Sequence, residues 1–216
     1  MEVTPFDFFA DQPFCIGTFA QRMAALGSLE PRLPATEPVG NHGGTLQRER
    51  LVLMAEWACR TWPGDLIETG TYGGETTALL AGVARRHGRK MRTIDSWPAG
   101  TAYDLDTVVR PAAYARLAPH ADVVEILEAD VRAGTTRDWV SQRRYCFAFA
   151  DTMKGHEHVR SEVGMLMDYT DGLVAVDDSY VESLLRACNE LALERPPWSL
   201  MRYSRLREAW LVKEIP

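Results

Sequence analysis

Residues 64–77 read GDLIETGTYGGETT, and this stretch decides the fold class. Leu66 and Ile67 form a short apolar run that is typical of a buried strand, and the glycines after it indicate a tight turn. A helix is expected from about Thr76, where the sequence continues TTALLAGVARRHG. A strand, a glycine-rich turn and a helix in this order favour a nucleotide-type ligand site at the carboxyl edge of a parallel sheet.

The residues of the turn distinguish between nucleotide ligands. The pyrophosphate of a dinucleotide calls for the pattern G-x-G-x-x-G, so that backbone amides can reach the anion. Here Tyr72 stands at the middle glycine position, and Glu68, two residues before the first glycine, would repel a phosphate. A carboxylate there suits a ligand with a cationic, amino-acid end. S-adenosylmethionine carries an ammonium and a sulfonium, and we therefore expect it as the ligand of this turn.

Length and composition set the broad class of the protein. The chain has 216 residues, of which 46% are hydrophobic and 25% charged, as is ordinary for a globular protein. This length suits one α/β domain, which we place at residues 45–216. Residues 1–44 are expected to form N-terminal helices, as a lid or a packing element, followed by a Pro- and Gly-rich connector. An aromatic N-terminus of this kind would also suit packing on another subunit in a homo-oligomer.

Charge and cysteine usage exclude several classes of partner. A net charge of −6 without a dense Lys/Arg stripe argues against nucleic acid. No apolar run approaches the roughly 20 residues that cross a bilayer, so no membrane partner is expected. The four isolated cysteines show no C-x-x-C spacing, and buried reduced thiols are favoured over disulfides or a zinc site. Together with an acidic N-terminus that is untypical of a secretory signal, this predicts a cytoplasmic protein. The cysteines are Cys15, Cys59, Cys146 and Cys188.

Predicted strands and helices alternate from Asp65 onward, after a helix over 45–62. Alternating βα units predict a Rossmann-like, doubly wound, mostly parallel seven-stranded sheet. The C-terminal segment predicts a hairpin, which adds an antiparallel strand. The expected strands are 65–69, 90–95, 121–130, 145–151 and 171–178 with the hairpin at 197–215, and the expected helices are 76–87, one running through 115–117, 137–142, 156–168 and 183–194.

Acidic residues stand at the ends of successive predicted strands. Ligands of open α/β sheets bind outside the carboxyl ends of the strands, so these acids should line one crevice. Asp95 stands about 20 residues beyond the turn, where such folds place an acid on ribose hydroxyls. Asp130 is expected on the adenine side, and Trp97 either packs on the adenosine or belongs to the core. The acids are Glu68, Asp95, Asp130, Asp151, Asp177 and Asp178.

Asp151, Asp177 and Asp178 differ from the others because they follow the neighbouring fourth and fifth strands. Three carboxylates brought together must share protons or hold a cation. Oxygen-only ligands select a hard ion such as Mg²⁺, with Ca²⁺ or Mn²⁺ as other candidates. The alternative is that Asp177 is structural and Asp178 caps the next helix.

These residues resemble the class I S-adenosylmethionine-dependent methyltransferases. More narrowly they resemble the macrocin/mycinamicin sugar O-methyltransferase group, whose relatives include cephalosporin-hydroxylase-like proteins. The resemblance covers about residues 45–182. The paired acid after the fifth strand, combined with Asp151, points to the metal-dependent subgroup. The matching segments are GDLIETG (64–70), GG (73–74), TIDS (93–96), FAD (149–151) and LVAVDDSY (173–180).

The resemblance implies a role for each acid. The acid before the turn and the turn backbone, here Glu68 and Gly70, would hold the methionine part of the cofactor. Asp95 would hold the ribose. The acids after strands four and five would bind Mg²⁺, which in turn chelates the acceptor hydroxyls. The residues expected around the cofactor are Glu68, Gly70, Thr71, Tyr72, Gly73, Gly74, Thr76, Asp95, Ser96, Trp97, Asp130 and Asp151, and those expected at the metal are Asp151, Asp177 and Asp178.

One position departs from the family pattern. Two residues after the fourth-strand aspartate the family usually carries a second acid, thought to be the general base, but here that position is Met153. Lys154, His156 and His158 follow closely, and histidine has a pKa suited to proton transfer near neutral pH. The residues expected to act in catalysis are therefore His156, Lys154 and Asp151, with His156 as the leading base.

The leading hypothesis is a divalent-metal-dependent O-methyltransferase that acts on a hydroxyl of a small molecule, such as a sugar or a natural product. Three other functions stay open: a metal-independent N- or O-methyltransferase, an NAD-binding oxidoreductase on the same α/β plan, and a non-catalytic cofactor-binding protein. The sequence does not identify the acceptor.

Overall fold

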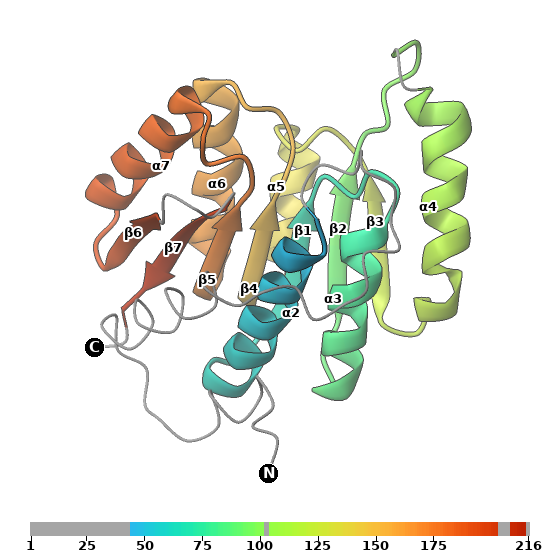
Figure 1. Ribbon diagram of the computed structural model, residues 1–216, viewed down its shortest axis with the longest axis horizontal. Helices are drawn as coiled ribbons and strands as arrows, with labels where there is room; N and C mark the ends of the chain where they lie inside the picture. The colour runs from blue at the N-terminus through green and yellow to red at the C-terminus, as the bar shows by residue number, and fades with distance from the viewer. Residues whose placement is uncertain (1–43, 102–103, 203–207, 215–216) are drawn as a thin grey trace.

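The computed structural model describes residues 44–101, 104–202 and 208–214, and they form one seven-stranded sheet (Figure 1). The strand order is β3-β2-β1-β4-β5-β7-β6. The pairs from β3 to β5 are parallel, and β7 runs antiparallel to both β5 and β6. The predicted fold class is thereby confirmed. The strands are β1 (Asp65–Thr69), β2 (Met91–Asp95), β3 (Val124–Glu128), β4 (Tyr145–Ala150), β5 (Thr170–Val176), β6 (Trp198–Arg202) and β7 (Ala209–Lys213).

Helices cover both faces of this sheet. Figure 1 shows α2 and α3 in front of the strands and α6 behind them. The helices are α2 (Gly44–Thr61), α3 (Glu75–Arg86), α4 (Arg110–Leu117), α5 (Gly134–Ser141), α6 (His156–Tyr169) and α7 (Glu182–Glu194), with a π-helical turn at Leu105–Val109 and a 3₁₀ turn at Ala118–His120. The helices expected within residues 1–43, and their role as a lid or packing element, lie outside the described residues.

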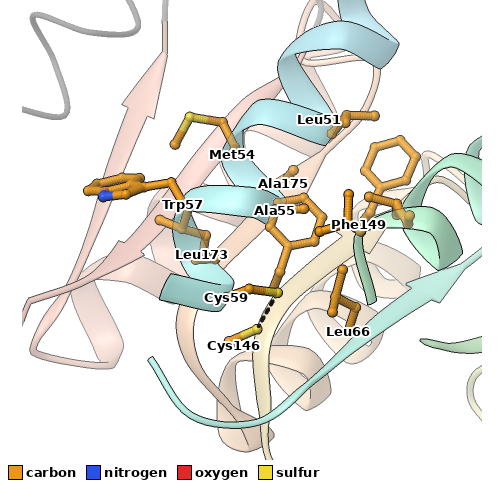
Figure 2. Packing of buried hydrophobic residues seen from close by; sticks show 14 of the residues in the cluster. Leu51, Met54, Ala55, Trp57, Cys59, Leu66, Cys146, Phe149, Leu173 and Ala175 are labelled. Carbon is orange, nitrogen blue, oxygen red and sulfur yellow. Dashed lines mark hydrogen bonds between the residues drawn. The ribbon is translucent and has the colours of Figure 1, made fainter. Parts of the chain in front are cut away.

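Two apolar clusters fill the space between the sheet and the helices. One joins α2 and α3 to the sheet, and the other joins α5, α6 and α7 to its opposite face. All six residues of β4 are buried, as expected for a central parallel strand covered on both sides. Figure 2 shows Met54 and Trp57 of α2 packed against Leu173 of β5. The loops at the carboxyl edge therefore emerge from strands that are packed on both faces.

The described cysteines are buried thiols, as predicted. Cys59 of α2 and Cys146 of β4 face each other across the core with their sulfur atoms 3.6 Å apart (Figure 2). Cys188 is buried in α7, and Cys15 lies outside the described residues. Within 44–101, 104–202 and 208–214, no helix is both long and apolar enough to cross a membrane.

Several elements are shorter than the sequence predicts. β3 begins at Val124 rather than at residue 121, because residues 121–123 form a turn. β5 ends at Val176, so Asp177 and Asp178 lie in the loop after the strand. Both differences arise where polar residues flank an apolar run. Loop residues can aim their side chains freely, whereas strand residues alternate between the two faces.

Candidate functional site

The glycine turn after β1 requires backbone conformations that favour glycine. Gly70 has φ +90°, Gly74 has φ +79° and Tyr72 has φ +46°. A Cβ atom on Gly70 would lie 2.1 Å from the carbonyl oxygen of Asp151. The turn therefore packs directly against the loop that follows β4. Gly74 is the left-handed N-cap of α3, whose first backbone N–H groups face the carboxyl edge of the sheet.

Asp95, at the end of β2, holds this turn in place. Its two carboxylate oxygens accept the backbone N–H of Tyr72 at 2.8 Å and the backbone N–H of Trp97 at 2.9 Å. The indole Nε1 of Trp97 donates to the carbonyl oxygen of Tyr72 at 2.9 Å. Trp97 is only 2% exposed, and its ring lies 6.0 Å from that of Tyr114. The structure thus favours the core interpretation of Trp97, and its contact with adenosine stays a prediction.

Glu68 lies beneath the turn rather than at its surface. Its side chain is 1% exposed and accepts hydrogen bonds from Thr77 of α3 and, at 3.3 Å, from Thr93 of β2. Burial raises the pKa of Glu68 to about 8, although these two hydroxyl groups oppose the shift. The carboxyl group therefore ties α3 and β2 to β1 and is poised to titrate. Its direct contact with a cofactor stays a prediction.

We expect Glu68→Gln to flatten the decline of stability between about pH 4.5 and about pH 8. A carboxyl whose pKa is higher folded than unfolded binds more protons in the native state, so its ionisation destabilises the fold as pH rises from about 4.5 to about 8. The difference amounts to at most about 1.4 kcal/mol per pH unit. Urea unfolding of both proteins at pH 5.5 and pH 8 measures it. Thr77→Val should have the opposite effect, because it removes a hydroxyl that stabilises the charged form. Equal pH dependence in Glu68→Gln and the parent protein would contradict this.

The remaining cofactor candidates occupy different parts of the same edge. Thr71 is buried and its hydroxyl lies 2.5 Å from that of Thr93, whereas Ser96 is exposed. Thr76 lies in the first turn of α3, and the Gly73 carbonyl accepts from Arg116 of α4. Asp130 follows β3 and pairs with Arg132 at 2.9 Å.

The pairing with Arg132 holds the pKa of Asp130 down, at about 2. That carboxylate is exposed and stays ionised. Its place on the adenine side of the cofactor stays a prediction.

The three acids predicted at the metal do meet. Each of Asp151, Asp177 and Asp178 offers a carboxylate oxygen, and these atoms lie within 4.8 Å of one another. We call these residues the acid triad. Asp178 has φ +58°, a conformation that non-glycine residues adopt at a cost and that recurs at functional sites. The helix-cap alternative for Asp178 is wrong, because α7 begins at Glu182 with Val181 as its N-cap.

Gln47 of α2 and the backbone of Asp178 orient Asp177 within the acid triad. Oδ1 of Asp177 accepts from the side-chain amide of Gln47 at 2.6 Å and from the backbone N–H of Asp178 at 2.7 Å. Gln47 belongs to α2, whose apolar face packs on β4 and β5. This helix therefore reaches the site through one buried amide. Asp177 is structural and at the same time a member of the acid triad.

Lys154 brings a positive charge to the acid triad. Its ammonium donates to Asp151 at 2.7 Å and lies 3.4 Å from Asp178. Burial of Lys154 disfavours its charged form, but the surrounding carboxylates outweigh this and raise the pKa of the amine. Gly155 after it is extended, with φ −70° and ψ +140°, which separates Lys154 from the helix that begins at His156.

His156, the leading base candidate from the sequence, points elsewhere. Its Nε2 lies 2.8 Å from Glu190 of α7 and its Nδ1 lies 3.0 Å from Glu157. As the first residue of α6 it faces the neighbouring helix, so the structure does not bring it to the acid triad. Lys154 is the candidate that the structure does place there.

Two polar residues near the site escaped the sequence analysis. Gln47 contacts Asp177 across 130 positions of the chain, and Glu162 of α6 accepts a hydrogen bond from Thr69, 93 positions away. Contacts of this range leave no local pattern. Glu162 has one signal, since it stands on the face of α6 that also carries the buried Val159, Val163 and Leu166.

The fold and the comparisons with solved structures agree. The cofactor-bound Rv0187 from MTB matches with a TM-score of 0.59 at 19% identity, covering 90% of this chain and 88% of that one. The O-methyltransferase TomG from Streptomyces achromogenes, in complex with SAM, has a TM-score of 0.55 at 18% identity, covering 79% and 81%. The SAH-bound methyltransferase PaMTH1 of Podospora anserina matches with a TM-score of 0.61 at 12% identity, covering 96% of this chain and 99% of that one.

The chain has the class I S-adenosylmethionine-dependent methyltransferase fold. No protein-family model matches the sequence, and no curated protein matches it at a significant level. The narrower resemblance to the sugar O-methyltransferase group therefore stays a prediction. The antiparallel β7 between β5 and β6 separates this methyltransferase fold from the dinucleotide-binding order 3-2-1-4-5-6, which weakens the NAD alternative.

Proposed function

We propose that the protein transfers the methyl group of S-adenosylmethionine to a hydroxyl of a small molecule, with a divalent cation at the acid triad. The observation that carries the proposal is the contact between the glycine turn and the loop that holds Asp151. Within the methyltransferase fold, the glycine turn packs on the Asp151 loop so closely that Gly70 has no room for a side chain. A methyl donor on the turn and an acceptor at the acid triad would therefore be neighbours.

The reaction is an in-line displacement. The acceptor oxygen attacks the methyl carbon, the bond from that carbon to sulfur breaks, and S-adenosylhomocysteine leaves, while the hydroxyl proton passes to a base, for which Lys154 is the candidate, or to water. Holding oxygen, carbon and sulfur collinear supplies most of the acceleration in such a step. The protein contributes a fixed turn, ordered by Asp95, and a fixed loop at Asp151.

The acid triad suits a hard divalent cation. It presents carboxylate oxygens only, which is the donor set that Mg²⁺, Mn²⁺ and Ca²⁺ prefer. Asp151, Asp177 and Asp178 would hold the ion. A bound cation of this kind lowers the pKa of a hydroxyl and fixes its orientation. The ammonium of Lys154 would give up its contact with at least one carboxylate when the ion binds.

Lys154 replaces His156 as the group that would meet the acceptor hydroxyl. Its Nζ atom lies among the acids, whereas both ring nitrogens of His156 contact glutamates. Met153 beside it is 67% exposed and has no group that accepts a proton usefully. The carboxylates raise the pKa of this amine, so as an ammonium it can orient the hydroxyl. A divalent cation at the acid triad would offset those charges and so favour the neutral amine, which can take the hydroxyl proton.

One observation favours a second candidate, a metal-independent methyltransferase. Lys154 already compensates part of the negative charge of the acid triad, so a cation from solution is not the only way to make three carboxylates compatible. The acceptor of such an enzyme would be oriented by the acids and the ammonium themselves.

Methyl transfer from labelled S-adenosylmethionine to a panel of hydroxylated metabolites tests the proposal, with and without EDTA. We expect product with at least one acceptor and a loss of at least about tenfold in rate after chelation, restored by Mg²⁺ or Mn²⁺. Turnover that EDTA leaves unchanged favours the metal-independent enzyme. A protein that fails to bind S-adenosylmethionine in calorimetry is not a methyltransferase.

A further inference from the structure

Glu162 is a buried acid that the proposed reaction does not use. It is 2% exposed, and its neighbours on the same face of α6 are apolar. One carboxylate oxygen accepts a hydrogen bond from the hydroxyl of Thr69, and the other accepts one from the hydroxyl of Thr152 at 2.5 Å. A buried carboxyl group is costly unless it is hydrogen-bonded. A leucine would avoid that cost, so what the acid contributes is a pair of acceptors aimed at two different loops.

The two hydroxyl groups belong to the two halves of the site. Thr69 is the last residue of β1 and immediately precedes Gly70 of the glycine turn. Thr152 immediately follows Asp151 of the acid triad. The loops also touch directly, because the backbone N–H of Asp151 donates to the carbonyl oxygen of Thr69 at 2.9 Å. Glu162 lies beneath this junction and is bonded to each side of it.

His158 extends the connection along α6. Thr152 has a single hydroxyl proton, and when it donates that proton to Glu162 its oxygen can only accept from His158 Nε2, which lies 2.9 Å away. Burial lowers the pKa of His158, which favours the neutral ring with one N–H. The result is a line of hydrogen bonds from His158 through Thr152 and Glu162 to Thr69.

We propose that Glu162 is a positioning residue, which sets the spacing between the glycine turn and the acid triad by accepting one hydroxyl from each. The consequence for catalysis rests on the proposed function, since that function puts the methyl donor on the turn and the acceptor at the acid triad. Glu162 touches neither reactant and acts through Thr69 and Thr152. A misplacement of about 1 Å can cost about a hundredfold in such a reaction, so a fixed spacing matters.

A comparison of Glu162→Leu with Glu162→Gln tests this. Leucine removes both acceptors, whereas glutamine keeps both links, because its oxygen can accept from Thr69 and its amide can donate to Thr152. Hydrogen exchange of residues 70–74 and 151–155 in the free protein is the first measurement. In Glu162→Leu we expect exchange to accelerate about tenfold or more in both segments. In Glu162→Gln we expect it to stay within about threefold of the parent protein.

The second measurement is the affinity for S-adenosylmethionine by calorimetry. It should weaken about tenfold in Glu162→Leu and stay nearly unchanged in Glu162→Gln. Thr152→Val is the matched control that breaks only one link, and it should accelerate exchange at 151–155 while the cofactor affinity holds. A merely structural role for the acid would lower the melting temperature of Glu162→Leu and leave the exchange of residues 70–74 unchanged, which overturns the inference.

The two proposals can fail separately. If the parent protein does not bind S-adenosylmethionine but Glu162→Leu still accelerates exchange in both segments, the proposed function is wrong and the positioning role of Glu162 stands. If the parent protein binds the cofactor but exchange in Glu162→Leu accelerates in only one of the two segments, the positioning role of Glu162 is wrong.

Discussion

Asp178→Asn is expected to abolish methyl transfer, with a loss of at least about a thousandfold, corresponding to the several kcal/mol of transition-state stabilisation that a divalent cation held by the acid triad would supply. The affinity for S-adenosylmethionine should change by less than about twofold, because Asp178 follows β5 whereas the glycine turn follows β1. Initial rates with labelled cofactor and calorimetric titrations with Mn²⁺ and with S-adenosylmethionine measure both effects.

Asparagine is chosen because it should not change the backbone conformation at this position. Asp178 has φ +58°, and asparagine tolerates this left-handed conformation about as well as aspartate. Only the charge and one oxygen ligand are removed. Asp122→Asn is the matched control: it neutralises an exposed acid that pairs with Arg85 in the turn before β3, away from the carboxyl edge of the sheet, so its turnover should hold. Unimpaired turnover in Asp178→Asn would refute the metal role.

Gly70→Ala should have the largest effect on stability, a loss of at least about 3 kcal/mol together with the loss of cofactor binding. Two causes act together. The residue has φ +90°, which an L side chain rarely adopts, and its Cβ would lie 2.1 Å from the backbone oxygen of Asp151. A backbone atom cannot turn aside as a side chain can, so the turn and the Asp151 loop must separate.

Gly88→Ala isolates the first of these causes. Gly88 has φ +63°, but nothing lies within 4 Å of its added Cβ. That variant should lose only about 1–2 kcal/mol, the usual cost of a left-handed L residue. Urea unfolding of both variants gives the difference, which is the contribution of the contact. Equal losses at the two positions would show that the glycine turn does not depend on its packing against Asp151.

The fold was readable from the sequence because its main signals are local. Alternating apolar strands and amphipathic helices predict a parallel sheet, and the sharp turn at Gly70 marks where a ligand would lie. The meeting of Asp151 with Asp177 and Asp178 followed from the same logic, since the carboxyl ends of neighbouring parallel strands share one edge.

The details of the site depended on directions that a sequence does not encode. His156 and Lys154 are two residues apart, yet one faces α7 and the other faces the acids, because the extended Gly155 stands between them. Gln47 meets Asp177 only because α2 packs on the sheet at a particular angle. The burial of Glu68 was not predictable for a related reason: the acid before the turn lies under it, enclosed by hydroxyl groups, and its contact with the cofactor stays a prediction.

The amide of Gln47 has a consequence for how this domain can be divided. β1 is the first strand of the sheet, and the acid triad comes later in the chain. A fragment that starts at Asp65 therefore contains every described strand and every carboxylate of the acid triad. It would lack the helix that covers β4 and β5 and the Gln47 amide that donates to Asp177. Any transplant of the acid triad into another protein, or any split of this chain into complementing halves, therefore has to carry α2 with it.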